Sequence, residues 1–210
     1  MWYNGYIHFT YSCRGSRSAL WLSRPEKNIM QLTKGQKVSY PNQGVCRIED
    51  IEKKTIGGNK MQFYSLRVLS DDSIILVPTD NAESIGVRPI ISNKQCKSLW
   101  SELESDFEPI SDDWKTRSRQ FTQKLQSGDV FEAADVLKKL TFLSHEKKLS
   151  FREQSLLEKA KFLIVSEICS VPKDASDELK IDSQVVDRVA CACSKHLIAN
   201  PPEEKVAAAH

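Results

Sequence analysis

Short apolar runs separated by turn residues occupy the first part of the chain. Between residues 34 and 78 the runs are rich in β-branched and aromatic residues, which strands favour. They are separated by Pro41-Asn42-Gln43-Gly44, by Gly57-Gly58-Asn59 and by Asp71-Asp72, residue types that reverse the chain or tolerate positive φ. The pattern predicts four or five short antiparallel strands, around residues 37–40, 45–51, 61–69 and 74–77, in a small curled sheet or barrel.

Helical periodicity begins after Arg88-Pro89. Residue types that cap helices open the helical segments, namely Ser92, one of Ser111-Asp112-Asp113, Asp129 and Ser150. Ser150 and Glu153 also have the spacing of a capping box. The apolar run at residues 156–168 indicates the central helix of a bundle, and the last helix is predicted at residues 182–198. The predicted fold class is therefore α+β, with a small antiparallel β domain followed by an all-α helical bundle domain.

Neither end of the chain shows strand or helix periodicity. Residues 1–29 mix aromatic residues, Ser and Arg, and Arg14 and Arg17 interrupt any signal-peptide apolar core. We expect a disordered extension or a translation start assigned too early, with Met30 as the working start. A binding arm formed by its Trp and Tyr residues is the alternative. The predicted division is an extension at 1–29, a β domain at 30–92, a helical domain at 93–198 and a flexible tail at 199–210.

Charge and cysteine content narrow the function classes. Among 210 residues, Lys+Arg 30 against Asp+Glu 28 leaves a net charge of +2, so any attraction to nucleic acid must come from a local patch. The six cysteines are scattered through apolar patterns, which indicates reduced thiols in a cytosolic protein rather than a disulfide framework. No apolar stretch approaches the roughly 18 residues that span a membrane. We expect a cytoplasmic protein.

The segment Trp114-Lys115-Thr116-Arg117-Ser118-Arg119 is the strongest candidate for a binding surface. It follows an acidic stretch and places cations in the first turns of a helix, where they oppose the helix macrodipole. Helix starts and Lys or Arg side chains both bind phosphates, and an exposed Trp is a flat apolar wedge or stacking plate. The alternative is that Trp114 packs the helix onto the bundle while the cations are solvated.

Motifs for catalysis or metal binding are weak by comparison. Cys191, Cys193 and His196 lie close together in the last helical segment, but the two thiols point about 200° apart on one helix and a fourth zinc ligand is missing nearby. Core cysteines explain this segment better. The sequence contains no GxSxG, P-loop, HExxH or dinucleotide motif. We expect no enzyme, no cofactor and no metal.

Ordered sequence motifs across both halves carry a family resemblance. In the first half they are KGQKVSYPNQGV (34–45), FYSLRV (63–68), Val77-Pro78, Asn81-Ala82 and IGVRPIIS (85–92). In the second half they are Trp114, Arg117, Leu125, SGDV (127–130), Ala134, Val136-Leu137, Leu140, KLS (148–150) and Leu157. Over residues 30 to about 198 the chain resembles the CarD/CdnL family of bacterial transcription regulators, in its short CdnL-like form.

The resemblance implies a function in transcription initiation. It implies a Tudor-like (SH3-like) N-terminal domain that docks on the RNA polymerase β subunit, as does the related domain of transcription-repair coupling factors. The helical domain then meets promoter DNA, largely independently of sequence, at the upstream edge of the transcription bubble. There the matching Trp wedges into the minor groove and stabilises the open complex. The protein would thus be held at the nucleoid through RNA polymerase, and it would be a monomer when free.

The resemblance also assigns residues to each partner. The DNA-binding positions are Trp114, Lys115, Arg117 and Arg119, and the polymerase-binding positions are Lys54, Ser65, Leu76 and Pro78. Thr116 stands where the family commonly has Arg, and Ser118 where it has Tyr, which puts one phosphate contact in doubt. Leu76 and Pro78 could instead be core and turn residues, and Lys54 a solvated lysine. The alternative function is a Tudor-like protein–protein adaptor without DNA contact.

Overall fold

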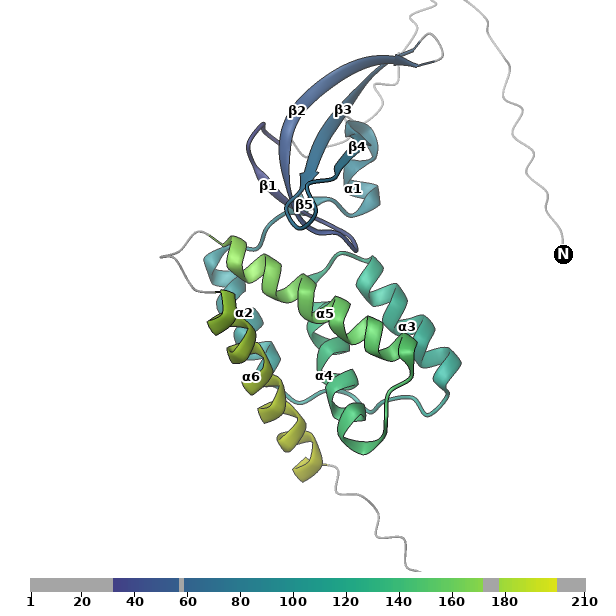
Figure 1. The fold of residues 1–210 in the computed structure, drawn as a ribbon, viewed down its shortest axis with the longest axis vertical. Coiled ribbons are helices and arrows are strands. Elements are labelled where there is room, and N and C mark those ends of the chain that lie inside the picture. Colours follow the sequence, from purple (N-terminus) through teal and green to yellow (C-terminus); the bar gives the residue numbers. More distant parts are fainter. Residues whose placement is uncertain (1–31, 57–58, 172–177, 200–210) are drawn as a thin grey trace, which may run out of the picture.

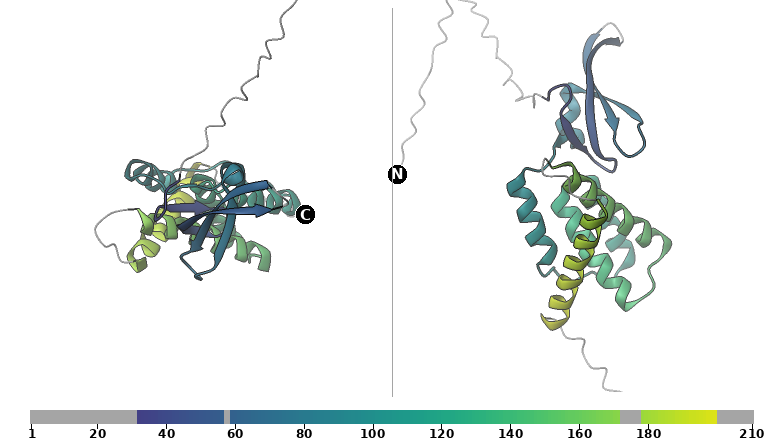
Figure 2. Two further views of the ribbon diagram at one scale, coloured as in Figure 1. Left: turned by 90° about the horizontal axis from the view of Figure 1, so that it is seen from above. Right: turned by 60° about the vertical axis from the view of Figure 1, so that its left-hand side comes forward.

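The structure is a computed structural model that describes residues 32–56, 59–171 and 178–199. The expectations for the extension at 1–29, for Met30 and for the Gly57-Gly58 reversal lie outside these ranges, as does the predicted tail from residue 200 onward. Figures 1 and 2 show a small sheet stacked on one end of a helical bundle. The α+β fold class predicted from the sequence is confirmed.

The sheet is antiparallel, with strand order β4-β3-β2-β1-β5. Its strands are β1 (Lys37–Tyr40), β2 (Gly44–Ile56), β3 (Asn59–Val68), β4 (Ile74–Pro78) and β5 (Arg88–Pro89). The four predicted strands are confirmed, and β2 runs five residues further than expected. Asn42 (φ 62°) and Gly44 (φ 79°) adopt the left-handed region in the turn before β2, as the turn residues predicted. The strand β5 was not predicted, because two residues are too few to show the alternation of a strand.

A compact apolar core lies inside this sheet. It includes Val38, Ile48, Leu66 and Val68, all of them fully buried. A register shift between Ile48 and Asp50 interrupts the β2–β3 ladder, and such bulges bend and twist a strand. One helical turn, α1 (Ala82–Ile85), follows β4 and adds Ala82 to the same core. Four residues are too few to show helical periodicity, so the sequence did not reveal α1.

Five helices follow β5: α2 (Asn93–Glu104), α3 (Trp114–Gln126), α4 (Val130–Glu146), α5 (Phe151–Ser170) and α6 (Glu178–Ala199). The predicted caps are confirmed at all four positions. Ser92 and Ser150 form capping boxes with Gln95 and Glu153, while Asp113 and Asp129 accept hydrogen bonds from first-turn amides. The last helix begins four residues earlier than predicted. Within the described ranges, no helix is long and apolar enough to cross a membrane.

The central helix of the bundle is α4, not α5 as the apolar run predicted. α4 contacts α2, α3, α5 and α6, and its buried side chains include Val136 and Leu140. α5 instead packs one face on α4 while its upper end reaches β2 (Figure 1). Its apolar run is long because it serves two neighbours: Ile164 is buried in the bundle, whereas Phe162 lies against Gly44 of β2.

Candidate functional site

The first turn of α3 is fixed by its N-cap residue. The Asp113 carboxylate accepts hydrogen bonds from the amides of Lys115 (3.2 Å) and Thr116 (3.1 Å) and from the Thr116 hydroxyl (2.5 Å). The hydroxyl and the two amides lower the pKa of Asp113, so it is ionised at neutral pH. The negative cap offsets the cations that follow in the first turns. Thr116 thus completes the cap with its hydroxyl as well as its amide.

Trp114 occupies the first position of α3 and is 61% exposed. The Nζ atom of Lys115 lies 5.7 Å from the centroid of its ring, within the range of a cation–π contact. The alternative in which Trp114 packs the helix onto the bundle is wrong, because a packing residue would be buried. The indole is presented to solvent on a rigid helix start.

Arg117 is the exception among the predicted DNA contacts. It is 3% exposed. One guanidinium nitrogen, Nη1, donates to the carbonyl of Ser111 (2.7 Å), and Nη2 donates to Glu153 Oε1 (2.9 Å). Arg117, Phe121 and Leu125 recur every four residues and form the buried stripe of α3. The sequence therefore contained the signal that Arg117 faces inward, and in this conformation its guanidinium does not reach the surface.

The Arg117–Glu153 pair joins the start of α3 to the start of α5. Burial opposes ionisation of Glu153, but hydrogen bonds from the Ser150 amide, from Arg117 and from the Ser150 hydroxyl outweigh it and lower its pKa to about 2. The same carboxylate thus completes the capping box of α5 and neutralises Arg117. Figure 1 shows the two helix starts at the same side of the bundle.

This junction brings further cations beside the indole. Two shallow hollows of about 600 and 490 Å³ are lined by Trp114, and Arg152 lines both of them. Lys147 and Lys148, from the loop before α5, line the second hollow. We call the exposed set the Trp114 face; it comprises Trp114, Lys115, Arg119, Lys147, Lys148 and Arg152. None of its cations forms an ion pair with another described residue.

The sequence did not reveal Lys147, Lys148 and Arg152 as site residues. They lie about 30 residues after Trp114 along the chain, and only the packing of α3 against α5 brings them close. Two buried polar atoms beneath this surface, Arg117 Nε and Ser118 Oγ, have no hydrogen-bond partner within the described part of the chain.

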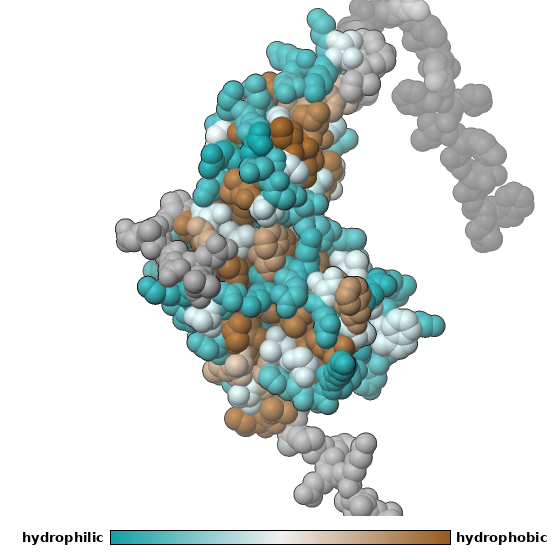
Figure 3. All heavy atoms as spheres, viewed as in Figure 1, coloured by the Kyte–Doolittle hydropathy of each residue, from teal (hydrophilic) through white to brown (hydrophobic). Residues whose placement is uncertain are grey.

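The predicted polymerase-binding residues lie mainly on β3 and β4. β4 is an edge strand of the sheet, and Ile74 (54% exposed) and Leu76 (45%) point to solvent along it. In the ladder Leu76 faces Ser65, two positions from Pro78. Figure 3 shows hydrophobic side chains gathered on the β domain around this edge. We call this surface, formed by Ile74, Leu76 and Pro78, the β4 edge.

The other two predicted polymerase-binding residues differ from Leu76 and Pro78. Ser65 is directly opposite Leu76 in the β3–β4 ladder, so both side chains lie on the same face of the sheet, but Ser65 is only 5% exposed and its hydroxyl is covered. Lys54 pairs with Met61 of β3, nearer the tip of the β2–β3 hairpin. Only the Phe63–Arg67 segment of β3 pairs with β4, so Lys54 lies outside the part of the hairpin next to the β4 edge. Its ammonium group forms an exposed ion pair with Glu52 (2.8 Å). The structure thus groups Leu76 with Pro78 and separates Lys54 from them.

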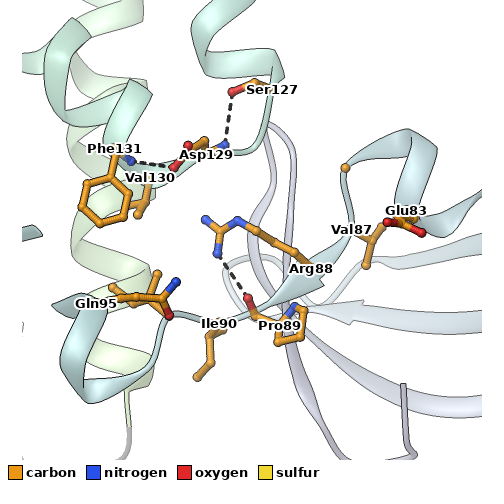
Figure 4. A pocket seen from close by; sticks show the side chains of 12 residues that line it. Glu83, Val87, Arg88, Pro89, Ile90, Gln95, Ser127, Asp129, Val130 and Phe131 are labelled. Carbon is orange, nitrogen blue, oxygen red and sulfur yellow. Dashed lines mark hydrogen bonds between the residues drawn. The ribbon is translucent and has the colours of Figure 1, made fainter. Parts of the chain in front are cut away.

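An ion pair connects the sheet to the bundle. Arg88 of β5 donates two hydrogen bonds to Glu167 of α5 (2.5 and 2.9 Å) and one to the carbonyl of Gly128 (2.9 Å). Glu167 also accepts from the Ile91 amide (3.1 Å). Figure 4 shows the Arg88 guanidinium reaching from the sheet toward the start of α4. Bidentate pairing of this kind fixes geometry as well as charge.

Close backbone packing adjoins that ion pair. Gly86 (φ 96°) and Gly128 (φ 78°) both lie against the Pro41 ring, and a Cβ atom on either would approach Pro41 Cγ to 2.9 or 3.0 Å. Side chains larger than hydrogen therefore do not fit at either position. These contacts hold the sheet against the bundle. They therefore also fix the position of the β4 edge relative to the Trp114 face.

The cysteines of α6 have different environments. Cys193 is buried, with its thiol 3.8 Å from the Lys138 carbonyl, whereas Cys191 is exposed. The His196 ring stacks on Phe107 (centroids 4.1 Å apart), and its Nδ1 lies 2.7 Å from Asp106 Oδ1. Among the described residues, no group of three or more His, Cys, Asp or Glu side chains could hold a metal ion.

Comparisons with known proteins match both parts of this chain. A family model described as "CarD-like/TRCF RID domain" matches residues 32–91, and one described as "CarD, C-terminal domain" matches residues 98–182. The chain is 30% identical over 138 residues to "Putative transcription factor YdeB" of Bacillus subtilis (strain 168), covering 64% of this chain and 88% of that protein. The solution NMR structure of the 72-residue N-terminal domain of Myxococcus xanthus CarD is 42% identical, covering 28% of this chain and 79% of that one, with a TM-score of 0.25.

Proposed function

Since this chain belongs to the CarD/CdnL family of transcription regulators, which are not enzymes, we propose that it joins RNA polymerase to promoter DNA. Interaction with RNA polymerase follows from the family of its first domain. The finer proposal is that the β4 edge docks on the β subunit while the Trp114 face stabilises the open promoter complex. The protein would act in the cytoplasm, at the nucleoid.

The exposure of Trp114 is the observation that carries the DNA half of the proposal. An indole that is 61% exposed on a capped helix start can enter a minor groove without unpacking the bundle. Inserted apolar side chains stabilise unstacked base steps, whose disruption costs a few kcal/mol. The surrounding lysines and arginines would bind phosphates and position the wedge without reading sequence. Opened DNA is stabilised relative to closed duplex.

The polymerase half rests on the β4 edge. An open strand edge offers unpaired amides and carbonyls to a partner strand, and alternate side chains add specificity. Leu76 and Ile74 would supply the apolar contacts. Lys54, on the exposed hairpin, would make a separate contact further from this edge, and Ser65 would lie beneath Leu76 on the same face of the sheet.

The test is the lifetime of an open promoter complex formed with RNA polymerase of the same organism. At a protein concentration that just saturates the wild-type effect, we expect the wild-type protein to lengthen this lifetime, and Trp114→Ala and Leu76→Arg to lose most of that effect. Ile198→Ala removes another highly exposed apolar side chain (82%), on α6, and should behave as wild type. If Trp114→Ala matched wild type while Leu76→Arg failed, the protein would be an adaptor that makes no DNA contact.

A further inference from the structure

The start of α5 carries the most exposed large hydrophobic side chain in the described part of the chain. Phe151 is 88% exposed, compared with 82% for Ile198 and 61% for Trp114. The helix does not require a phenyl ring there, because Ser150 and Glu153 make the capping box. Full burial of such a side chain is worth roughly 1.5–3 kcal/mol. A partner that covers it would therefore gain affinity.

Phe151 lies beside the Trp114 face. Its two chain neighbours, Ser150 and Arg152, both line the hollow of about 490 Å³ next to Trp114, and consecutive Cα atoms are about 3.8 Å apart. The Arg117–Glu153 pair (2.9 Å) keeps the two helix starts together. Two exposed aromatic side chains, Trp114 and Phe151, are thus presented from adjoining helix starts.

The surroundings indicate which kind of partner would cover Phe151. Lys147, Lys148 and Arg152 are exposed around it, whereas the nearest carboxylate, Glu153, is already paired with Arg117. A protein-docking patch is usually a contiguous apolar area of several hundred Å², while here one ring stands among cations. Aromatic side chains in a basic groove are typical of surfaces that bind single-stranded nucleic acid by stacking on its bases.

We infer that Phe151 is a second DNA-contacting aromatic residue, which stacks on an unpaired base at the bubble edge while Trp114 holds the adjoining duplex. The inference rests on the proposed function, because it requires the Trp114 face to meet opened DNA. Arg152 and Lys148 bind the phosphates beside that base.

Site-specific photocrosslinking tests the contact directly. The full-length protein with p-benzoylphenylalanine in place of Phe151 is assembled with RNA polymerase and promoter DNA, and the crosslinked nucleotide is mapped. We expect a crosslink to an unpaired nucleotide at the upstream edge of the bubble. The same substitution at Ile198 is the control and should give none. A crosslink to polymerase alone, to paired duplex only, or to nothing would overturn the inference.

Open-complex lifetime then separates this inference from the proposed function. Stacking on one base is worth at least about fivefold, so Phe151→Ala should shorten the lifetime by that factor and Phe151→Tyr should preserve it. If Trp114→Ala shortens the lifetime and Phe151→Ala does not, the second contact is wrong and the proposed function stands. If Trp114→Ala has no effect either, the proposed function itself falls.

Discussion

The β4 edge and the Trp114 face present aromatic or aliphatic side chains to solvent in opposite settings. On the β4 edge, Ile74 and Leu76 stand on an open strand whose backbone groups can pair with another strand. On the Trp114 face, the indole stands among cations that have no ion-pair partners in the described structure. The first setting suits a protein strand and the second a polyanion. Although the net charge of the chain is only +2, the Trp114 face thus brings together five cations, Lys115, Arg119, Lys147, Lys148 and Arg152.

The two surfaces also differ in what supports them. The β4 edge is backed by apolar residues of the sheet such as Leu66 and Val77. The Trp114 face is backed by a buried ion pair, Arg117–Glu153. Removing one partner of a buried pair leaves an uncompensated charge. We therefore expect the DNA-facing side to be far more sensitive to single substitutions in its support.

The largest expected effect comes from Arg117→Met. Loss of one partner of a buried ion pair costs about 3–5 kcal/mol, so the free energy of unfolding, measured by urea denaturation followed by circular dichroism, should fall by that amount. Arg119→Met, on the exposed side of the same helix, is the matched control and should stay within about 0.5 kcal/mol of wild type. Equal stability of the two variants would mean that Arg117 is not buried in solution.

Glu167→Gln tests whether the two surfaces work as one unit. The substitution weakens the charged hydrogen bonds between Arg88 and Glu167, worth about 1.5–3 kcal/mol, and loosens the sheet from the bundle. We expect polymerase binding to remain near wild type while open-complex lifetime shortens. Glu158→Gln, an exposed change on the same helix, should alter neither. A variant that keeps full lifetime would show that the junction does not aim the Trp114 face.

Salt concentration should separate the two surfaces further. Phosphate contacts release counterions, so affinity falls with added salt by a slope of about 0.9 per contact. The gain in open-complex lifetime should therefore shrink as salt rises, whereas binding to polymerase alone should change little. Lys148→Gln and Arg152→Gln should each lower the slope by about one contact, and Lys94→Gln, an exposed lysine on α2, should not. If polymerase binding and open-complex lifetime depended equally on salt, the two surfaces would not differ in the kind of partner they bind.

The last prediction concerns the pH dependence of stability that Glu153 confers. Its pKa falls from 4.5 to about 2 in the folded protein, so the ionised carboxylate contributes its full stabilisation above pH 4.5. That contribution is lost as the pH falls from 4.5 toward 2. Urea denaturation at a series of pH values should show this loss in wild type. Glu153→Gln should have a lower free energy of unfolding than wild type at pH 7, and this free energy should fall less on acidification. If the free energy of unfolding fell equally with pH in the variant and in wild type, other carboxylates would be responsible.

Local signals in the sequence predicted the fold better than the site. Caps such as Asp113 and Ser150 mark helix starts because they act within a few residues. The site depends on contacts between distant segments: Arg152 and Lys148 approach Trp114 only through the packing of α3 on α5. Arg117 was predicted to lie on the surface because it is charged, although its four-residue spacing to Phe121 and Leu125 places it on the buried face of the helix. The choice of α4 over α5 as central helix likewise depends on α5 serving the sheet as well.

The most direct test of the account measures open-complex lifetime against protein concentration for wild type, Leu76→Arg and Trp114→Ala. Docking and DNA contact predict different curves. Leu76→Arg should reach the wild-type lifetime at a higher concentration, because it weakens only the attachment. Trp114→Ala should saturate at the wild-type concentration with a much shorter lifetime, because attachment is intact and the wedge is gone. A Trp114→Ala plateau equal to that of wild type would contradict the central claim.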